Sequence, residues 1–142
     1  MVTKENINRF LEVLEDITKV FTSIEYFQDD PSLTKYDLLA LDVVYNQKGI
    51  IMSQLAKKLI VGMSTATGIV DKLVEKNLVE RRRNHDDRRV VKLILTKKGN
   101  EAAISHQNKK MEIVKQTLKL LSSEDQESLI SILEKLSEKI GE

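Results

Sequence analysis

The residues best suited to bind another molecule are arginines, and most of them are clustered. Five of the six arginines lie within nine residues, at Arg81, Arg82, Arg83, Arg88 and Arg89. A guanidinium group presents its N–H donors as a planar fork, which suits bidentate hydrogen bonds to a phosphate or to a guanine edge. Residues 81–98 carry a net charge of +6, although the whole chain carries +1. Such an excess is either a solvated hairpin tip or a surface for a polyanion.

The arginines fall in two segments whose patterns predict β-strands, residues 78–83 and 89–95. In the second segment, Val91, Leu93 and Leu95 are spaced two residues apart, as expected for one face of a strand. Turn-forming residues occupy positions 84–87 between the strands, so we expect a hairpin with arginines near its tip. Asp87 either simply forms this turn or holds a following arginine by a charge-assisted hydrogen bond.

Apolar residues at three- to four-residue spacing predict helices in the rest of the chain. The expected helices cover residues 7–24, a segment that Thr34 caps and Gly49 closes, residues 53–59, and residues 63–76, which Asn77 ends in the left-handed conformation. After the strands, Thr96 is expected to cap a helix that reaches about Leu121. A capping box formed by Ser123 and Gln126 is expected to begin the last helix.

Two short helices joined by a tight turn and followed by a hairpin are typical of a winged helix-turn-helix, whose second helix enters the major groove of DNA. The first turns of that helix carry Ser64, Thr65 and Thr67, whose hydroxyls can reach bases or phosphates, and Gly68, which leaves room for close approach. Hydroxyl residues are also common at helix starts, where they satisfy free amides. The basic hairpin decides in favour of DNA, because arginine is attracted to the narrow minor groove of A·T tracts.

These motifs together resemble the MarR family of bacterial regulators. The resemblance rests on Leu55-Ala56, residues 64–73, residues 78–81, Asp87-Arg88-Arg89 and residues 95–99. The D-R-R hairpin followed by L-T-x-x-G is its most specific part. Several positions depart from the family pattern: Gly68 stands where many members have arginine, Asn77 replaces the usual glycine, His85 with Arg83 occupies wing positions where proline is frequent, and Ile51 stands where a serine or threonine cap is common.

The resemblance implies a mainly α-helical fold with a small β-hairpin wing. It implies an N-terminal dimerisation helix in residues 1–32, a winged helix-turn-helix in residues 33–96 and C-terminal dimerisation helices in residues 97–142. A homodimer is expected on a pseudo-palindromic operator in double-stranded DNA; the alternative is a monomeric helical bundle. The expected DNA-binding residues are Ser64, Thr65, Thr67, Gly68, Lys72, Arg81, Asp87, Arg88 and Arg89.

The resemblance further implies a ligand-responsive repressor, with a small-molecule pocket between the dimer helices and the winged helix. Candidate pocket residues are Tyr26, Phe27, Tyr36 and His106. The alternative from another functional class is a helical protein-interaction module, an adaptor or antirepressor, that uses the basic hairpin to bind an acidic protein partner. Specific binding to duplex DNA with a steep salt dependence would distinguish the two.

Composition excludes several other functions. The chain of 142 residues has no cysteine, which excludes disulfides, thiol nucleophiles, cysteine-ligated zinc and thiol redox sensing. Its two histidines, His85 and His106, lack nearby ligands at metal-binding spacing, and no phosphate-binding loop or catalytic triad is present. We therefore expect no enzyme activity, no metal and no cofactor. No signal peptide or membrane-spanning run is apparent, so a cytoplasmic location is expected.

Overall fold

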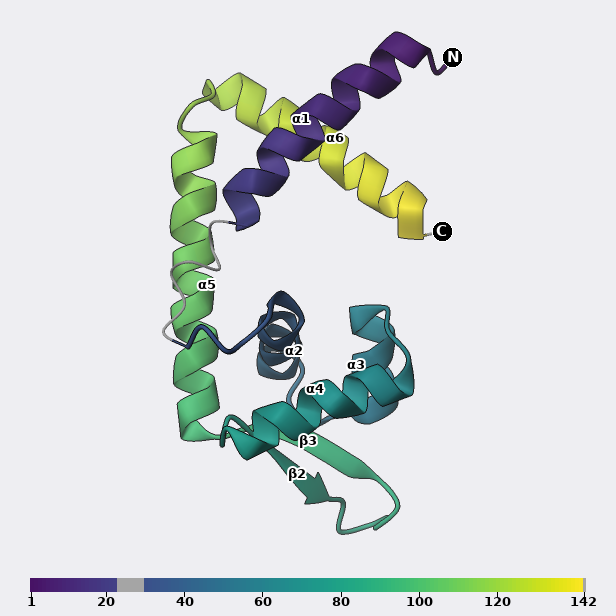
Figure 1. The fold of residues 1–142 in the computed structure, drawn as a ribbon, viewed down its shortest axis with the longest axis vertical. Coiled ribbons are helices and arrows are strands. Elements are labelled where there is room, and N and C mark those ends of the chain that lie inside the picture. Colours follow the sequence, from purple (N-terminus) through teal and green to yellow (C-terminus); the bar gives the residue numbers. More distant parts are fainter. Residues whose placement is uncertain (23–29, 142) are drawn as a thin grey trace. The chain divides into compact units, whose positions relative to one another are not determined.

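The computed structural model describes residues 1–22 and 30–141. Within them the elements follow the order α1 (Lys4–Thr22), α2 (Lys35–Asn46), β1 (Ile50–Ile51), α3 (Met52–Leu59), α4 (Met63–Glu75), β2 (Val79–Arg83), β3 (Val91–Leu95), α5 (Lys97–Leu118) and α6 (Ser123–Gly141) (Figure 1). The predicted class, mainly helical with a hairpin wing, is confirmed. The chain divides into two compact units, residues 1–109 and 110–142, and each is described by itself. None of the helices described is both long and apolar enough to cross a membrane.

The three strands form one antiparallel sheet in the order β1-β3-β2. Strands β2 and β3 pair from Val79 opposite Leu95 to Arg83 opposite Val91, which confirms the predicted hairpin. The edge strand β1 was not predicted. Ile50 pairs with Leu93, and a strand of two residues has no alternation to reveal it, because it exists only through pairing with a distant segment.

The core of the first unit lies among α2, α3, α4, the sheet and the start of α5. Leu41, Leu55, Leu73 and Leu93 are completely buried in it. Helix α4 contributes Ala66, Val70 and Leu73, whose three- to four-residue spacing places them on one face. Packing of this face fixes α4 in the fold, and the opposite face is exposed to solvent and accessible to a ligand.

The caps of two helices are those that the sequence predicts. Thr34 and Asp37 form a reciprocal capping box at the start of α2, with 2.7 Å from the Thr34 backbone N to Asp37 Oδ2. Thr96 Oγ1 accepts a hydrogen bond of 2.9 Å from the backbone N of Gly99 at the start of α5. Ile51 precedes α3 and has no polar side-chain atom, but Gln54 Oε1 accepts from its backbone N at 3.2 Å.

Among residues 1–22 and 30–141, two residues other than glycine have a positive φ. Asn77 has φ +60°, as predicted for the residue that follows α4. Ile60, in the turn between α3 and α4, has φ +56° and is 92% exposed. Gly62 has φ −70° and is the N-cap of α4. Ile60 is β-branched, and such a residue is strained in the left-handed region. The rest of the fold therefore stabilises a turn conformation that is locally unfavourable.

The start of α5 lies against the backbone that leads into β2. A Cβ added to Gly99 would lie 1.8 Å from the carbonyl oxygen of Leu78, so only glycine fits there. The same carbonyl accepts a hydrogen bond of 3.1 Å from the backbone N of Thr96. Thr96 Oγ1 also donates to the carbonyl of Asn77 at 2.6 Å. These contacts fix the base of the hairpin against α5.

In the second unit, the predicted start of the last helix is off by one residue. Ser122, rather than Ser123, caps α6, because its Oγ accepts from the backbone N of Asp125 at 3.1 Å. The side-chain amide of Gln126 donates to the carbonyls of Leu118 and Leu121, at 2.9 and 3.1 Å. Gln126 therefore satisfies the end of α5 instead of completing a capping box with Ser123.

Candidate nucleic-acid interface

The first half of α4 presents small side chains to solvent. Ser64, Thr65 and Gly68 are exposed, and Thr67 is half-buried at the edge of this surface. Because Ala66 and Val70 point into the core, Ser64 and Gly68 lie on the opposite face, four residues apart. A Cβ added to Gly68 would meet nothing within 4 Å. The sequence-predicted residues of this helix, apart from Lys72, therefore form one open surface of small side chains.

Arg89 is held at the tip of the hairpin by Asp87. Asp87 Oδ1 accepts hydrogen bonds from the backbone N and from Nε of Arg89, at 3.0 and 3.1 Å, and Oδ2 accepts from Nη2 at 3.3 Å. These bonds lower the pKa of the Asp87 carboxyl below its ordinary value. The Arg89 side chain is 92% exposed, so its guanidinium is oriented and still accessible.

The other arginines of the hairpin differ in their contacts. Arg81 pairs with Asp71 on the exposed side of α4. Arg82 pairs with Glu80 at 3.1 Å, and Nη1 of Arg83 donates to the carbonyl of Arg88 at 2.8 Å. Within the residues that the structure describes, the side chain of Arg88 has no hydrogen bond or ion pair. Arg88 and Arg89 are therefore the arginines most available to a ligand.

The ammonium group of Lys72 is bound to the segment around the start of α2, unlike the other predicted residues of α4, which form the open surface. Its Nζ donates to Asp37 Oδ2 and to the carbonyl of Ser32, both at 2.7 Å. The carboxylate of Asp37 is almost completely buried, with 3% of its side chain exposed. One turn later, Nζ of Lys76 pairs with Asp30 Oδ2 at 3.0 Å. Both lysines of this stretch thus bind the segment that precedes and begins α2.

These ion pairs were missed by reasoning from the sequence. Lys72 and Asp37 are 35 residues apart, and Lys76 and Asp30 are 46 apart, so no local pattern reports them. Asp37 carries one signal, an acidic side chain three residues after a capping threonine. The capping box explains that signal without an ion pair.

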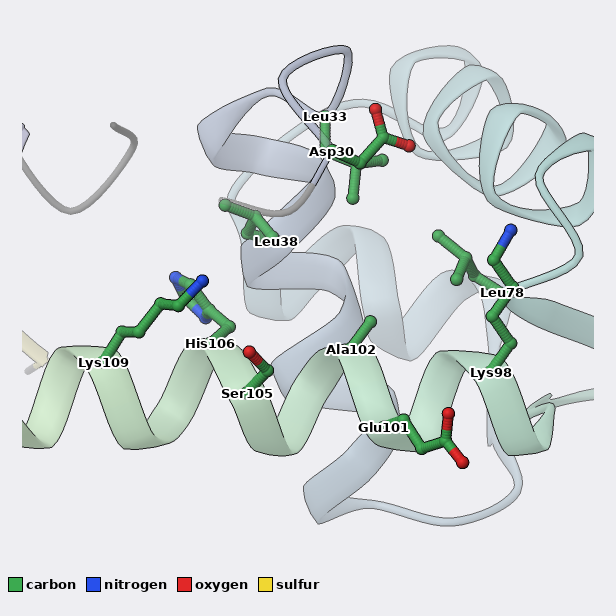
Figure 2. A pocket seen from close by; sticks show the side chains of 10 residues that line it. All are labelled: Asp30, Leu33, Leu38, Leu78, Lys98, Glu101, Ala102, Ser105, His106 and Lys109. Carbon is green, nitrogen blue, oxygen red and sulfur yellow. The ribbon is translucent and has the colours of Figure 1, made fainter. Parts of the chain in front are cut away.

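A cavity of about 610 Å³ lies in the first unit, beside α5 (Figure 2). Its apolar lining comes from Leu33, Leu38, Leu78 and Ala102, and its polar lining from Asp30, Lys98, Glu101, Ser105, His106 and Lys109. His106 Nδ1 lies 3.2 Å from Asp42 Oδ2. Of the residues predicted to line a pocket, His106 lines this cavity and Tyr36 is exposed and is not part of its lining. Tyr26 and Phe27 lie outside the described residues.

No group of three or more histidine, cysteine, aspartate or glutamate side chains is placed to hold a metal ion within residues 1–22 and 30–141.

Comparison with known proteins relates the central part of the chain to a family. The MarR family model matches residues 33–91. The uncharacterized HTH-type transcriptional regulator YdgJ of Bacillus subtilis (strain 168) is 28% identical over 115 residues, which span 81% of this chain and 70% of that protein.

Two solved structures share the fold over nearly the whole chain. Streptococcus pneumoniae FabT in complex with DNA is 25% identical with a TM-score of 0.85, over 98% of both chains. A MarR family protein from Bacillus stearothermophilus is 20% identical, also with a TM-score of 0.85, over 100% of both. The predicted resemblance is confirmed: residues 33–91 match the MarR family model, and the chain shares the winged-helix fold of a MarR family protein over its length.

Proposed function

We propose that this protein regulates transcription by binding a pseudo-palindromic operator as a homodimer, with α4 in the major groove and the hairpin tip in the neighbouring minor groove. The observation that carries the proposal is the exposed guanidinium of Arg89, which Asp87 orients on the same winged helix that presents the small polar face of α4. FabT, which shares this fold, has been solved in complex with DNA.

The proposal assigns complementary roles to α4 and the hairpin. Ser64, Thr65 and Thr67 offer short hydroxyls that can bond bases or phosphates, and Gly68 lets the helix backbone approach the groove. These residues carry no charge, so the electrostatic attraction must come from elsewhere. Arg88 and Arg89 supply it, at the phosphates and in the minor groove.

Arg81 contributes to DNA binding indirectly, through its ion pair with an acidic residue of α4. Asp71 lies on the exposed side of that helix, where its carboxylate would repel phosphates of a bound duplex. Arg81 pairs with Asp71 and so neutralises this charge. We place Arg81 among the residues that prepare the surface for DNA, because its guanidinium is already engaged.

Exposed apolar stripes on two helices support dimerisation. On α1, six apolar side chains at helical spacing are 41–58% exposed: Ile7, Phe10, Leu11, Leu14, Ile17 and Phe21. On α6, in the other unit, the corresponding side chains are 38–76% exposed: Leu129, Ile132, Leu133, Leu136 and Ile140. Contiguous apolar surface is unfavourable in water, and a second copy of the chain would cover it. Two-fold symmetry would then place two copies of α4 about 34 Å apart, one turn of DNA.

The cavity beside α5 supports control by a small molecule, and we propose that its occupant releases the protein from DNA, as in a ligand-responsive repressor. Leucine side chains would bury an apolar body, while Lys98 and Lys109 favour an acidic group. A molecule that binds one conformation of the protein better shifts the population toward it.

Selection of bound sequences from random duplexes by the purified full chain, followed by titration at increasing salt, tests DNA binding. We expect a two-fold-symmetric sequence, two chains per duplex and an affinity that falls steeply with salt concentration. Weak binding without sequence preference would reject the proposal. It would leave the alternative, a module whose basic hairpin binds an acidic protein partner.

A further inference from the structure

The C-terminal end of α4 is tied to two residues that line the cavity. Nζ of Lys76, the C-cap residue of α4, donates to Asp30 Oδ2 at 3.0 Å. Nζ of Lys98, on α5, donates to the backbone carbonyl of Lys76 at 3.2 Å. Asp30 and Lys98 both line the cavity (Figure 2). Two residues of the cavity lining therefore hold Lys76: Asp30 binds its side chain and Lys98 binds its carbonyl.

A second attachment lies one turn earlier on α4. We call residues 30–37 the strap, since they bind both lysines of this helix. Lys72 donates to the carbonyl of Ser32 and to Asp37, and Lys76 donates to Asp30 and to the hydroxyl of Ser32. Residues 72 and 76 are four apart, so their side chains leave the same side of α4. The strap thus runs along α4 and ends at the cavity.

Burial makes the attachment through Asp37 stronger than an ordinary surface ion pair. The side chain of Asp37 is 3% exposed, and a buried carboxylate that loses its cation is strongly unfavourable. Asp30 is more exposed, but hydrogen bonds from Ser32 and Lys76 lower its pKa to about 2. The Asp30 carboxyl is therefore charged at neutral pH. Both acids bind lysines of α4 and its C-cap.

We propose that Asp30 and Lys98 are positioning residues that set the C-terminal end of α4 for DNA binding, with Lys76 as the group on which both act. The inference rests on the proposed function and adds its regulation. An acidic occupant of the cavity would draw Lys98 away from the Lys76 carbonyl and repel Asp30. The last turn of α4 would then lose two of its attachments, and the surface around Ser64 and Gly68 would be held less firmly. Lys72 acts in the same way, by binding the strap rather than a phosphate.

The substitution Asp30→Asn tests the proposal by the sign of its effect. It removes a negative charge, so electrostatics alone would tighten binding to the duplex enriched in the selection described above. Positioning predicts weaker binding, by about three- to tenfold, with an unchanged slope of affinity against salt because no phosphate contact is lost. Fluorescence anisotropy with the labelled duplex measures both quantities.

Glu101→Gln is the matched control. Glu101 lines the same cavity, and within the described residues it has no hydrogen bond or ion pair. Its substitution makes the same change in charge without touching α4, so affinity should stay equal or rise slightly. Thermal unfolding of each variant establishes that the protein is folded at the assay temperature.

A double-substitution cycle separates positioning from a general loss of stability. If Asp30 acts through Lys76, Asp30→Asn combined with Lys76→Met should bind DNA no more weakly than Lys76→Met alone. Lys76→Arg, which keeps the cation, should restore most of the affinity. The positioning role of Asp30 is overturned if Asp30→Asn binds DNA as tightly as Glu101→Gln. It is also overturned if the losses of affinity caused by Asp30→Asn and by Lys76→Met simply add in the double variant. Failure of the proposed function is distinguishable, because the wild-type protein would then bind no sequence specifically.

Discussion

Asp87 accepts hydrogen bonds from both the backbone N–H and the guanidinium of Arg89, two residues further along the hairpin. The pair stabilises one orientation of a side chain that is otherwise exposed to solvent. An arginine oriented in advance loses less conformational entropy on binding than a mobile one. The acid beside the arginine therefore favours binding of a polyanion even though its own charge opposes it.

Replacing Asp87 with asparagine should weaken DNA binding by about two- to fivefold, the range of exposed ion pairs. The variant loses the charge-assisted bond to Arg89 while its net charge rises by one. Asp86→Asn makes the same change in charge at a neighbouring exposed position and should bind like the wild type. Anisotropy titrations of the two variants decide the matter, and tighter binding by Asp87→Asn would show that charge outweighs orientation.

Gly99→Ala should destabilise the fold. The new Cβ would lie 1.8 Å from the carbonyl oxygen of Leu78, and backbone must shift to relieve the overlap. We expect a loss of about 1–3 kcal/mol in the free energy of unfolding, the usual cost of overpacking, or somewhat more because the neighbour is backbone. Chemical denaturation measures it. A free energy equal to that of the wild type would mean that α5 does not approach Leu78 this closely.

Gly68→Ala should have opposite effects on stability and on DNA binding. Nothing lies within 4 Å of the added Cβ, and alanine is the better helix former by about 1 kcal/mol, so the free energy of unfolding should rise. The same methyl group would stand on the surface proposed to enter the major groove, so affinity for the selected duplex should fall. Denaturation and anisotropy on one preparation measure both effects, and unchanged affinity would place Gly68 away from the duplex.

The ion pair of Asp30 and Lys76 predicts a pH dependence of stability. Its hydrogen bonds lower the pKa of Asp30 from 3.8 to about 2 in the folded protein, so the folded state binds the proton less readily than the unfolded state. The resulting stabilisation is complete above about pH 4 and is lost as pH falls toward 2. The wild-type protein should therefore unfold at a higher temperature than Asp30→Asn at pH 6, and the difference should shrink toward pH 2. A constant difference would contradict this origin.

Local signals account for most of the fold that the sequence predicts. Thr34 and Thr96 cap their helices and Asn77 ends α4, because each role depends on residues within one turn. The hairpin follows from the alternation in β3. Strand β1 depends on pairing with a distant strand, and the left-handed Ile60 is imposed by the packing of α3 and α4 on either side of a short turn. Neither has a local signal.

The candidate site also combines features that local sequence signals predict with features that depend on distant residues. The pairing of Asp87 with Arg89 joins residues two apart, and it is one of the two roles that the sequence allows Asp87. Lys72 is predicted at DNA from its place in the motif, whereas the structure directs its ammonium to Asp37, which lies 35 residues away. The positions on α4 could thus be inferred from sequence, but the partners of its long side chains depend on how the strap crosses the helix.

Arg89→Ala is the most direct test of DNA binding through the winged helix. The wild type and the variant are titrated with the selected duplex, and with duplexes altered at the flanking A·T positions, over a range of salt concentrations. We predict that the variant loses about 1–3 kcal/mol of binding free energy and most of its preference at the flanks. Arg82→Ala, which removes an equal charge from an arginine paired with Glu80, should lose less. Equal affinity of Arg89→Ala and the wild type at every salt concentration would contradict the proposed interface.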